Sequence, residues 1–153
     1  AEHLMLVDLE RNDLGRLCKA GTVAVTDFML LEKYSHVSHI VSNISGCLLP
    51  DRGVFEILKA VFPGGTITGC PKIRCMEIIN ELEPVQRGPY SGSFGYIGYA
   101  PYMDLNIIIR SIIVTNGNAS FHVGAGIVAD SVPEKEYQET LDKAAAMVEA
   151  LED

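Results

Sequence analysis

The chain has 153 residues, of which 48% are hydrophobic and 21% charged, enough apolar material for the core of one domain or of part of one. Its net charge of -8 would repel a phosphate backbone or an anionic membrane surface. Its apolar runs are shorter than the roughly 18 residues of a membrane span. The composition therefore argues against disorder, nucleic-acid binding and membrane insertion.

The N-terminal third predicts a helix followed by two strands. Apolar residues recur at helical spacing over residues 2–18, and Gly21 ends this helix. β-branched and apolar residues dominate residues 22–34 and 39–48, which indicates two strands. The chain starts at Ala1 without an initiator Met and already in helical periodicity, so we expect a fragment of a longer protein.

The middle of the chain predicts two helices around a glycine-rich loop. Asp51 is a suitable N-cap for a helix over about residues 52–62. Pro71 suits the first turn of a helix that continues to about residue 83. Between them, residues 63–70 hold too many glycines for regular structure.

The C-terminal half predicts three strands and a final helix. Glycines among aromatic residues at 90–99 indicate a strand onto which another segment packs closely. Residues 103–115 and 119–129 flank Asn116-Gly117, the strongest hairpin signal in the chain. The order of elements predicts an α+β fold with a largely antiparallel sheet.

The final helix is expected to start at a capping box formed by Ser131 and Glu134 and to continue to the C-terminus. Its apolar residues follow a three-four spacing, which predicts the stripe that faces the core. This stripe consists of Tyr137, Leu141, Ala144, Val148 and Leu151.

Glu136, Glu139 and Lys143 form a second stripe of that helix, where we expect little water. Two carboxylates at i and i+3 repel each other unless a cation lies between them. Mg²⁺ prefers one or two protein carboxylates and leaves positions for water and an anionic ligand. Alternatively, Glu139 and Lys143 form an ordinary surface pair and Glu136 is solvated.

The glycine loop has the G-x-x-x-x-G spacing of a phosphate loop, but Cys70 and Pro71 follow where Lys and Ser or Thr are needed. The nucleotide interpretation therefore fails. The loop presents N–H groups and the Thr66 and Thr68 hydroxyls at a helix N-terminus, which favours a carboxylate or phosphate. A purely structural turn explains the glycines equally well.

Two kinds of isolated polar residue leave two interpretations open. Arg110 interrupts the apolar residues 106–114. It either binds a carboxylate in a bidentate manner or faces water. His36 and His39 are structural unless a substrate lies beside them.

The cysteines show none of the spacings of a zinc site. We therefore expect reduced thiols in a cytoplasmic protein. The residues concerned are Cys18, Cys47, Cys70 and Cys75.

Taken together, several segments form a known series of motifs. They are residues 2–13, 34–39, 63–72 (PGGTITGCPK) and 124–127, and residues 130–131 leading to Glu136 and Glu139. This series resembles the chorismate-utilising enzymes, which include anthranilate synthase component I, aminodeoxychorismate synthase component I, isochorismate synthase and salicylate synthase. The resemblance covers nearly the whole chain in the family's order.

The resemblance implies a Mg²⁺-dependent reaction on chorismate. By motif position Glu2 and Glu139 resemble the metal ligands, with Glu136 close by, and the ion would bridge to the ring carboxylate. Lys143 resembles the family's helix lysine at that carboxylate. His39, rather than His36, matches the histidine beside the ring hydroxyl that leaves.

The remaining substrate contacts are also implied by motif position. Tyr90 and Arg110 match the pair that holds the enolpyruvyl carboxylate. Gly124 and Gly126 match the backbone that approaches the substrate, and Thr66 matches the site threonine of the glycine loop.

Within the family, residues 63–69 and 103–106 look more like aminodeoxychorismate synthase than anthranilate synthase. Residues 34–37, 125–128 and 132–137 are equally common in anthranilate synthases. We therefore expect amination of chorismate at C4, with ammonia from a glutamine amidotransferase partner, in the route to para-aminobenzoate and folate. Anthranilate synthase component I is the alternative, and a non-catalytic interaction module is the alternative of another class.

The resemblance extends only to the C-terminal third of the family. Residues 1–153 are thus expected to be one fragment of a chorismate-binding domain of two stacked, mainly antiparallel sheets with helices outside. The segment with the family's reactive lysine would precede them, so we expect no synthase activity from this chain alone. Incomplete sheets would leave exposed edges that favour self-association.

Overall fold

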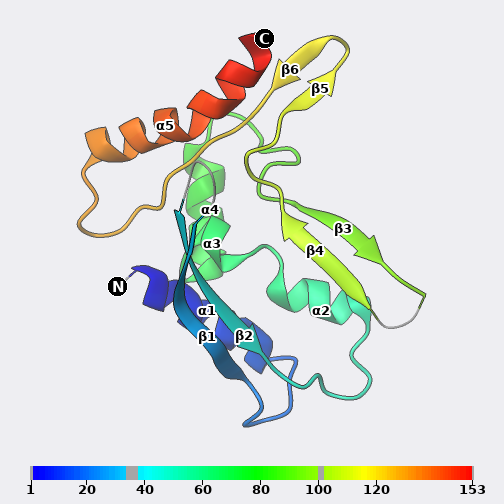
Figure 1. Cartoon of the computed structure of the whole chain (residues 1–153). Coiled ribbons are helices and arrows are strands. Elements are labelled where there is room, and N and C mark those ends of the chain that lie inside the picture. Colours follow the sequence, from blue (N-terminus) through cyan, green and yellow to red (C-terminus); the bar gives the residue numbers. More distant parts are fainter. Residues whose placement is uncertain (1, 34–37, 100–101, 153) are drawn as a thin grey trace. The chain divides into compact units, whose positions relative to one another are not determined.

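The structure is a computed structural model that describes residues 2–33, 38–99 and 102–152. It divides into two compact units, Ala1–Glu81 and Leu82–Asp153. Figure 1 shows the elements in chain order. His36 lies outside the described residues.

The first unit combines helices with one antiparallel strand pair. Its elements are α1 (Glu2–Gly15), β1 (Ala24–Lys33), β2 (Ser38–Ser45), α2 (Val54–Val61), α3 (Gly65–Thr68) and α4 (Lys72–Leu82). The two strands pair over their whole length with register shifts in β1, and α1 contacts β2, α2 and α3 (Figure 1). The first unit therefore has its helix α1 at its centre.

The buried apolar side chains of the first unit come from α1 and the turn that follows it. Val7 and Leu9 are buried on the helix, and Leu17 and Cys18 are buried just beyond it. Backbone hydrogen bonds from Lys19 to Cys47 and from Leu49 to Leu17 join this turn to the segment after β2. The helix is thus fixed by both its packed face and its C-terminal end.

The second unit consists of two strand pairs and a long helix. Its elements are β3 (Ser93–Ile97), β4 (Met103–Ile107), β5 (Ile113–Thr115), β6 (Asn118–Ser120) and α5 (Pro133–Glu152). Strands β3 and β4 pair antiparallel, as do β5 and β6. The turn at Asn116 and Gly117 has φ of 53° and 77°, so the predicted hairpin is confirmed.

The α+β class is confirmed, since helices accompany antiparallel strand pairs. Several predicted boundaries were wrong. The strand expected over 103–115 is divided into β4 and β5, with Arg110 between them at a φ of 49°. Residues 121–129 form no strand, and the loop expected at 63–70 contains the short helix α3. Among the described residues, no helix has the length and hydropathy needed to cross a membrane.

The start of α5 and its orientation also differ from expectation. The helix begins at Pro133, and the Ser131 hydroxyl accepts a hydrogen bond from the Val128 N–H instead of capping the helix. The stripe predicted to face the core is largely exposed: Tyr137, Leu141, Val148 and Leu151 are 42% to 66% exposed. Met147, on the stripe of Glu136 and Lys143, is only 6% exposed. On this charged stripe Glu136 and Lys143 are half-buried, whereas Glu139 is exposed.

Candidate functional site

The site residues predicted from sequence fall in both units. The first unit contributes Glu2, His39 and Thr66. The second unit contributes Tyr90, Arg110, Gly124, Gly126, Glu136, Glu139 and Lys143.

In the first unit, a cavity of about 590 Å³ brings two predicted residues together. His39 reaches it from β2 and Thr66 from the first turn of α3, while Glu10 and Asp13 line it from α1. The His3 ring, also on α1, makes a 2.7 Å hydrogen bond between its Nε2 and the Ser42 hydroxyl. The cavity thus lies between polar side chains of a helix, a strand and the glycine loop.

The glycine loop is less open than the sequence predicted. The N–H groups of Ile67, Thr68 and Gly69 bond to the carbonyls of Gly64 and Gly65 within α3, and the Thr68 hydroxyl donates to Gly64 O at 3.2 Å. These donors are therefore engaged inside the loop. Thr66, whose side chain is exposed, is the hydroxyl that the loop offers to the cavity.

Glu10 is the cavity carboxyl with a perturbed acidity. Burial raises the pKa of Glu10 above its ordinary value of 4.5, and the nearby Asp13 carboxylate raises it further. The Lys72 ammonium acts in the opposite direction. The first unit thus concentrates acidic groups at one wall of the cavity.

In the second unit, four predicted residues lie together. Lys143 Nζ donates to Gly124 O at 3.1 Å and forms an ion pair of 2.5 Å with Glu139 Oε1. A Cβ atom added at Gly124 would lie 2.9 Å from the Tyr90 hydroxyl, so the glycine allows this close approach. A carboxylate, an ammonium and a phenol therefore surround one bare stretch of backbone.

The Tyr90 ring is held by residues that the sequence analysis missed. It stacks on the His122 ring at 5.5 Å and 16°, and the Arg87 guanidinium lies 5.6 Å from its centroid. Arg87 is fixed by a bidentate contact to Glu83 and by a 2.9 Å hydrogen bond to the buried Ser91 hydroxyl. The spacing of Glu83 and Arg87 by four residues was the available signal.

The acidity of this pair follows from its geometry. Hydrogen bonding from Arg87 lowers the pKa of Glu83, and the same contact raises the pKa of Arg87. Both groups therefore stay charged, and Arg87 presents a permanent cation to the Tyr90 ring.

The other predicted residues of the second unit lie apart from this contact set. Glu136 is half-buried and lines a cavity of about 380 Å³ with Ala125 and Ile127. Arg110 and Gly126 are exposed, and Arg110 makes no hydrogen bond or ion pair to the residues that the structure describes. Its left-handed backbone removes it from the apolar strand in which it was expected.

The metal site expected from sequence is represented only in part. Glu136 and Glu139 lie one turn apart on α5 and carry hard oxygen donors of the kind that Mg²⁺ prefers. The Glu2 side chain lies outside the described part of the structure. Within that part, no three His, Cys, Asp or Glu side chains form a group that could hold a metal ion.

In the second unit, an ammonium and a phenol thus lie beside the bare backbone of Gly124. The model of the chorismate binding enzyme family matches residues 1–149. The chain belongs to this family, and the resemblance found in its motifs is confirmed.

Relatives bear two kinds of name. A Synechocystis protein named anthranilate synthase component I-like is 60% identical over 99% of this chain and 31% of its own length. The Bacillus subtilis aminodeoxychorismate synthase component 1 is 59% identical over 99% of this chain and 32% of its own length. The chain thus spans about a third of these curated relatives.

A solved structure supports the fold. The crystal structure of anthranilate synthase component I from Streptococcus pneumoniae superposes with a TM-score of 0.89 at 48% identity. The match covers 95% of this chain and 34% of that one.

Proposed function

We propose that this chain is the carboxylate-binding part of an enzyme that aminates chorismate to 4-amino-4-deoxychorismate. The single observation that carries the proposal is the contact set of Tyr90, Gly124, Glu139 and Lys143 in a member of the chorismate-binding family. The name of the Bacillus subtilis relative, aminodeoxychorismate synthase component 1, supports this reaction.

Each residue has a role that its chemistry suits. The Lys143 ammonium, oriented by Gly124 O and Glu139, balances the charge of the ring carboxylate. Tyr90 donates a hydrogen bond from its hydroxyl to the enolpyruvyl carboxylate, and the exposed Arg110 guanidinium binds the same group in a bidentate manner.

The first unit supplies the polar groups for the hydroxyl that leaves. His39 acts as the acid that protonates the departing C4 oxygen, and Thr66 orients the substrate by hydrogen bonding. Their position on one cavity supports a shared task.

Mg²⁺ is the cofactor that this proposal requires. Glu2, Glu136 and Glu139 would hold it, and the two carboxylates one turn apart on α5 suit it in donor type and spacing. When bound, the ion would supply positive charge at the ring carboxylate.

The proposal extends to a partner and a compartment. The word component in the names of the relatives supports a second subunit or domain, for which we propose a glutamine amidotransferase that delivers ammonia. Reduced cysteines are in keeping with a cytoplasmic enzyme. The Streptococcus pneumoniae structure favours anthranilate synthesis as the second candidate.

Product analysis tests the reaction. The full-length protein that carries this sequence is incubated with chorismate, Mg²⁺ and ammonium, and the products are separated by chromatography. We expect aminodeoxychorismate from the full-length protein and no turnover from the 153-residue chain. Anthranilate as the main product would overturn the assignment in favour of the second candidate.

Calorimetry tests the metal and substrate assignment in the full-length protein. Glu139→Ala is expected to lose Mg²⁺ and chorismate binding together, whereas Glu149→Ala, an exposed carboxylate on the same helix, is expected to keep both. Mg²⁺-dependent turnover that survives in Glu139→Ala would exclude Glu139 as a ligand. Absence of any Mg²⁺ or chorismate binding by the unmodified protein would favour the non-catalytic module.

A further inference from the structure

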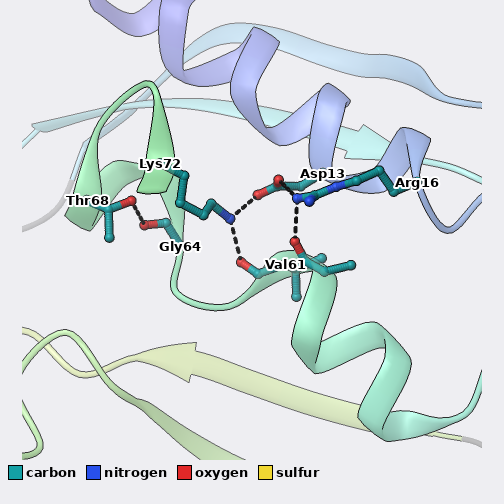
Figure 2. Close-up of polar contacts among 7 residues, drawn as sticks. Asp13, Arg16, Val61, Gly64, Thr68 and Lys72 are labelled. Carbon is teal, nitrogen blue, oxygen red and sulfur yellow. Dashed lines mark hydrogen bonds and ion pairs between the residues drawn. The ribbon is translucent and has the colours of Figure 1, made fainter. Parts of the chain in front are cut away.

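A buried carboxylate on α1 holds two cations from different directions. Asp13 is 6% exposed, and Figure 2 shows Lys72 and Arg16 converging on its two oxygens. Lys72 Nζ lies 2.5 Å from Asp13 Oδ2, with its side chain only 16% exposed. The Asp13–Lys72 pair is therefore largely shielded from water, whereas Arg16 is 59% exposed.

Both cations also reach the end of α2. Lys72 Nζ lies 3.5 Å from Val61 O, and Arg16 donates to Ala60 O at 2.8 Å (Figure 2). Lys72 is the first residue of α4, and the glycine loop, residues 63–70, lies between α2 and α4. The two ends of the segment that contains this loop therefore meet at the same carboxylate. Asp13 thus closes this loop at its base.

The glycine loop contacts α1 at a second point. Gly65 is buried, and a Cβ atom there would overlap the Leu9 side chain one turn before Asp13. Thr66 follows directly and faces the cavity that His39 and Asp13 also line. The position of the Thr66 hydroxyl therefore depends on how the loop is held at its base.

We propose that Asp13 and Lys72 are positioning residues whose buried ion pair holds the glycine loop so that Thr66 faces the cavity beside His39. Its consequence for turnover rests on the proposed function, whereas its consequence for the loop does not. A buried ion pair adds little net stability over apolar residues of similar size, but it fixes one geometry. The orientation of Thr66 is the feature that such a pair would fix.

Hydrogen exchange in the full-length protein that carries this sequence tests the proposal directly. Lys72→Met removes the ammonium, and the double variant Asp13→Asn/Lys72→Met removes the charges of both partners of the pair. The control Arg11→Met breaks the exposed pair of Arg11 and Asp8 on the same helix. In both test variants we expect the amides of the glycine loop to exchange at least about tenfold faster, with α1 unchanged.

Kinetics provide the readout that a merely stabilising pair would not change. With chorismate as substrate, the double variant is expected to lose about tenfold in kcat with KM within about twofold of the unmodified enzyme, because Thr66 is misplaced while the carboxylate contacts remain. The Arg11→Met control is expected to match the unmodified enzyme in both constants.

The outcomes separate the two proposals. If the loop amides of the double variant exchange at the same rate as in the unmodified protein, the positioning role is overturned. Faster exchange spread evenly over the first unit would overturn it as well. A loss of the same size in kcat/KM that comes from a higher KM, with kcat unchanged, would also contradict the positioning role. Faster loop exchange in a protein that does not convert chorismate would refute the proposed function and leave the positioning role supported.

Discussion

The two units hold their site residues by different means. In the first unit, α1 packs its buried face against the glycine loop, and a shielded ion pair closes that loop. In the second unit, Met147 is the buried apolar side chain among the described residues. Here Tyr90, Gly124 and Lys143 are held by ring contacts and polar bonds to Arg87, His122 and Glu139.

This difference determines which perturbations each part of the site resists. Packing against a helix spreads the cost of a change over many atoms, whereas a ring stack or a single ammonium contact depends on one partner. The first unit should therefore be sensitive to volume and buried charge, and the second to individual polar residues.

The largest expected effect is self-association of the isolated chain. The described strands form three two-stranded sheets, so each strand has an unpaired edge. Leu31 in the first unit and Phe94 in the second are 60% and 73% exposed. We expect oligomers by light scattering, reduced more by Phe94→Lys than by Leu31→Lys. A monodisperse monomer would contradict the prediction.

Each unit has a glycine in close contact with another segment, Gly65 in the first unit and Gly95 in the second. Gly95→Ala is expected to be the more damaging change. Its Cβ would overlap the backbone carbonyl of Asp104 on the paired strand, which has no rotamer to change. We expect a loss of about 3 kcal/mol in the free energy of unfolding, measured in urea. Gly15→Ala, with no atom within 4 Å of the new Cβ, serves as the control.

Gly65→Ala is the matched change in the first unit. Its Cβ would overlap the Leu9 side chain, which can rotate away, so we expect a loss of about 2 kcal/mol. The double variant with Leu9→Ala should cost less than the sum of the single changes, since the smaller side chain makes room. Strict additivity would show that Gly65 and Leu9 do not press on each other.

Arg87→Met tests the polar support of Tyr90. It removes the bidentate contact to Glu83 and the bond to the buried Ser91 hydroxyl, and we expect a loss of about 1–2 kcal/mol in urea unfolding. Chorismate KM in the full-length protein should rise as well. The matched change Arg74→Met breaks an exposed pair with Glu77 and should cost almost nothing. Equal costs for the two variants would remove the special role of Arg87.

Short sequence patterns predicted correctly the features that depend only on neighbouring residues. The Asn116-Gly117 turn formed its hairpin because both residues adopt positive φ readily. Arg110 was wrongly placed inside a strand, since the apolar pattern around it does not show the left-handed kink at its own backbone. The loop at 63–70 was expected to be irregular because glycine lowers helix propensity, but Gly65 is the residue that lets α3 lie against Leu9.

Motif position supplied the candidate site residues, whereas their burial and their partners depend on packing. Glu139 and Lys143 form the ordinary pair that was the alternative interpretation of this stripe, and the apolar stripe of α5 faces outward, because periodicity identifies an apolar face and not what covers it. Asp13 was missed although it lies four residues after the buried Leu9, on the same face of its helix. A charge at such a position signals a buried partner, here Lys72.

The smallest expected effect is a pH dependence of opposite sign in the two units. Burial raises the folded pKa of Glu10 above 4.5, so the folded state takes up the proton first as the pH falls. Hydrogen bonding to Arg87 lowers the folded pKa of Glu83, so there the unfolded state takes up the proton first. Acid therefore relieves a cost at Glu10 and removes a stabilising contact at Glu83.

Two glutamine variants separate these contributions in urea unfolding between about pH 7 and pH 3. Glu10→Gln should be more stable than the unmodified chain at neutral pH, and its advantage should vanish as the pH falls through the raised pKa to 4.5. Glu83→Gln should be less stable, and its deficit should vanish below 4.5 as the pH falls through the lowered pKa. Both differences should stay under about 1 kcal/mol, because these side chains are partly solvated. Curves that shift in the same direction would show that the two carboxyl groups are held alike, and the contrast between the units would fail.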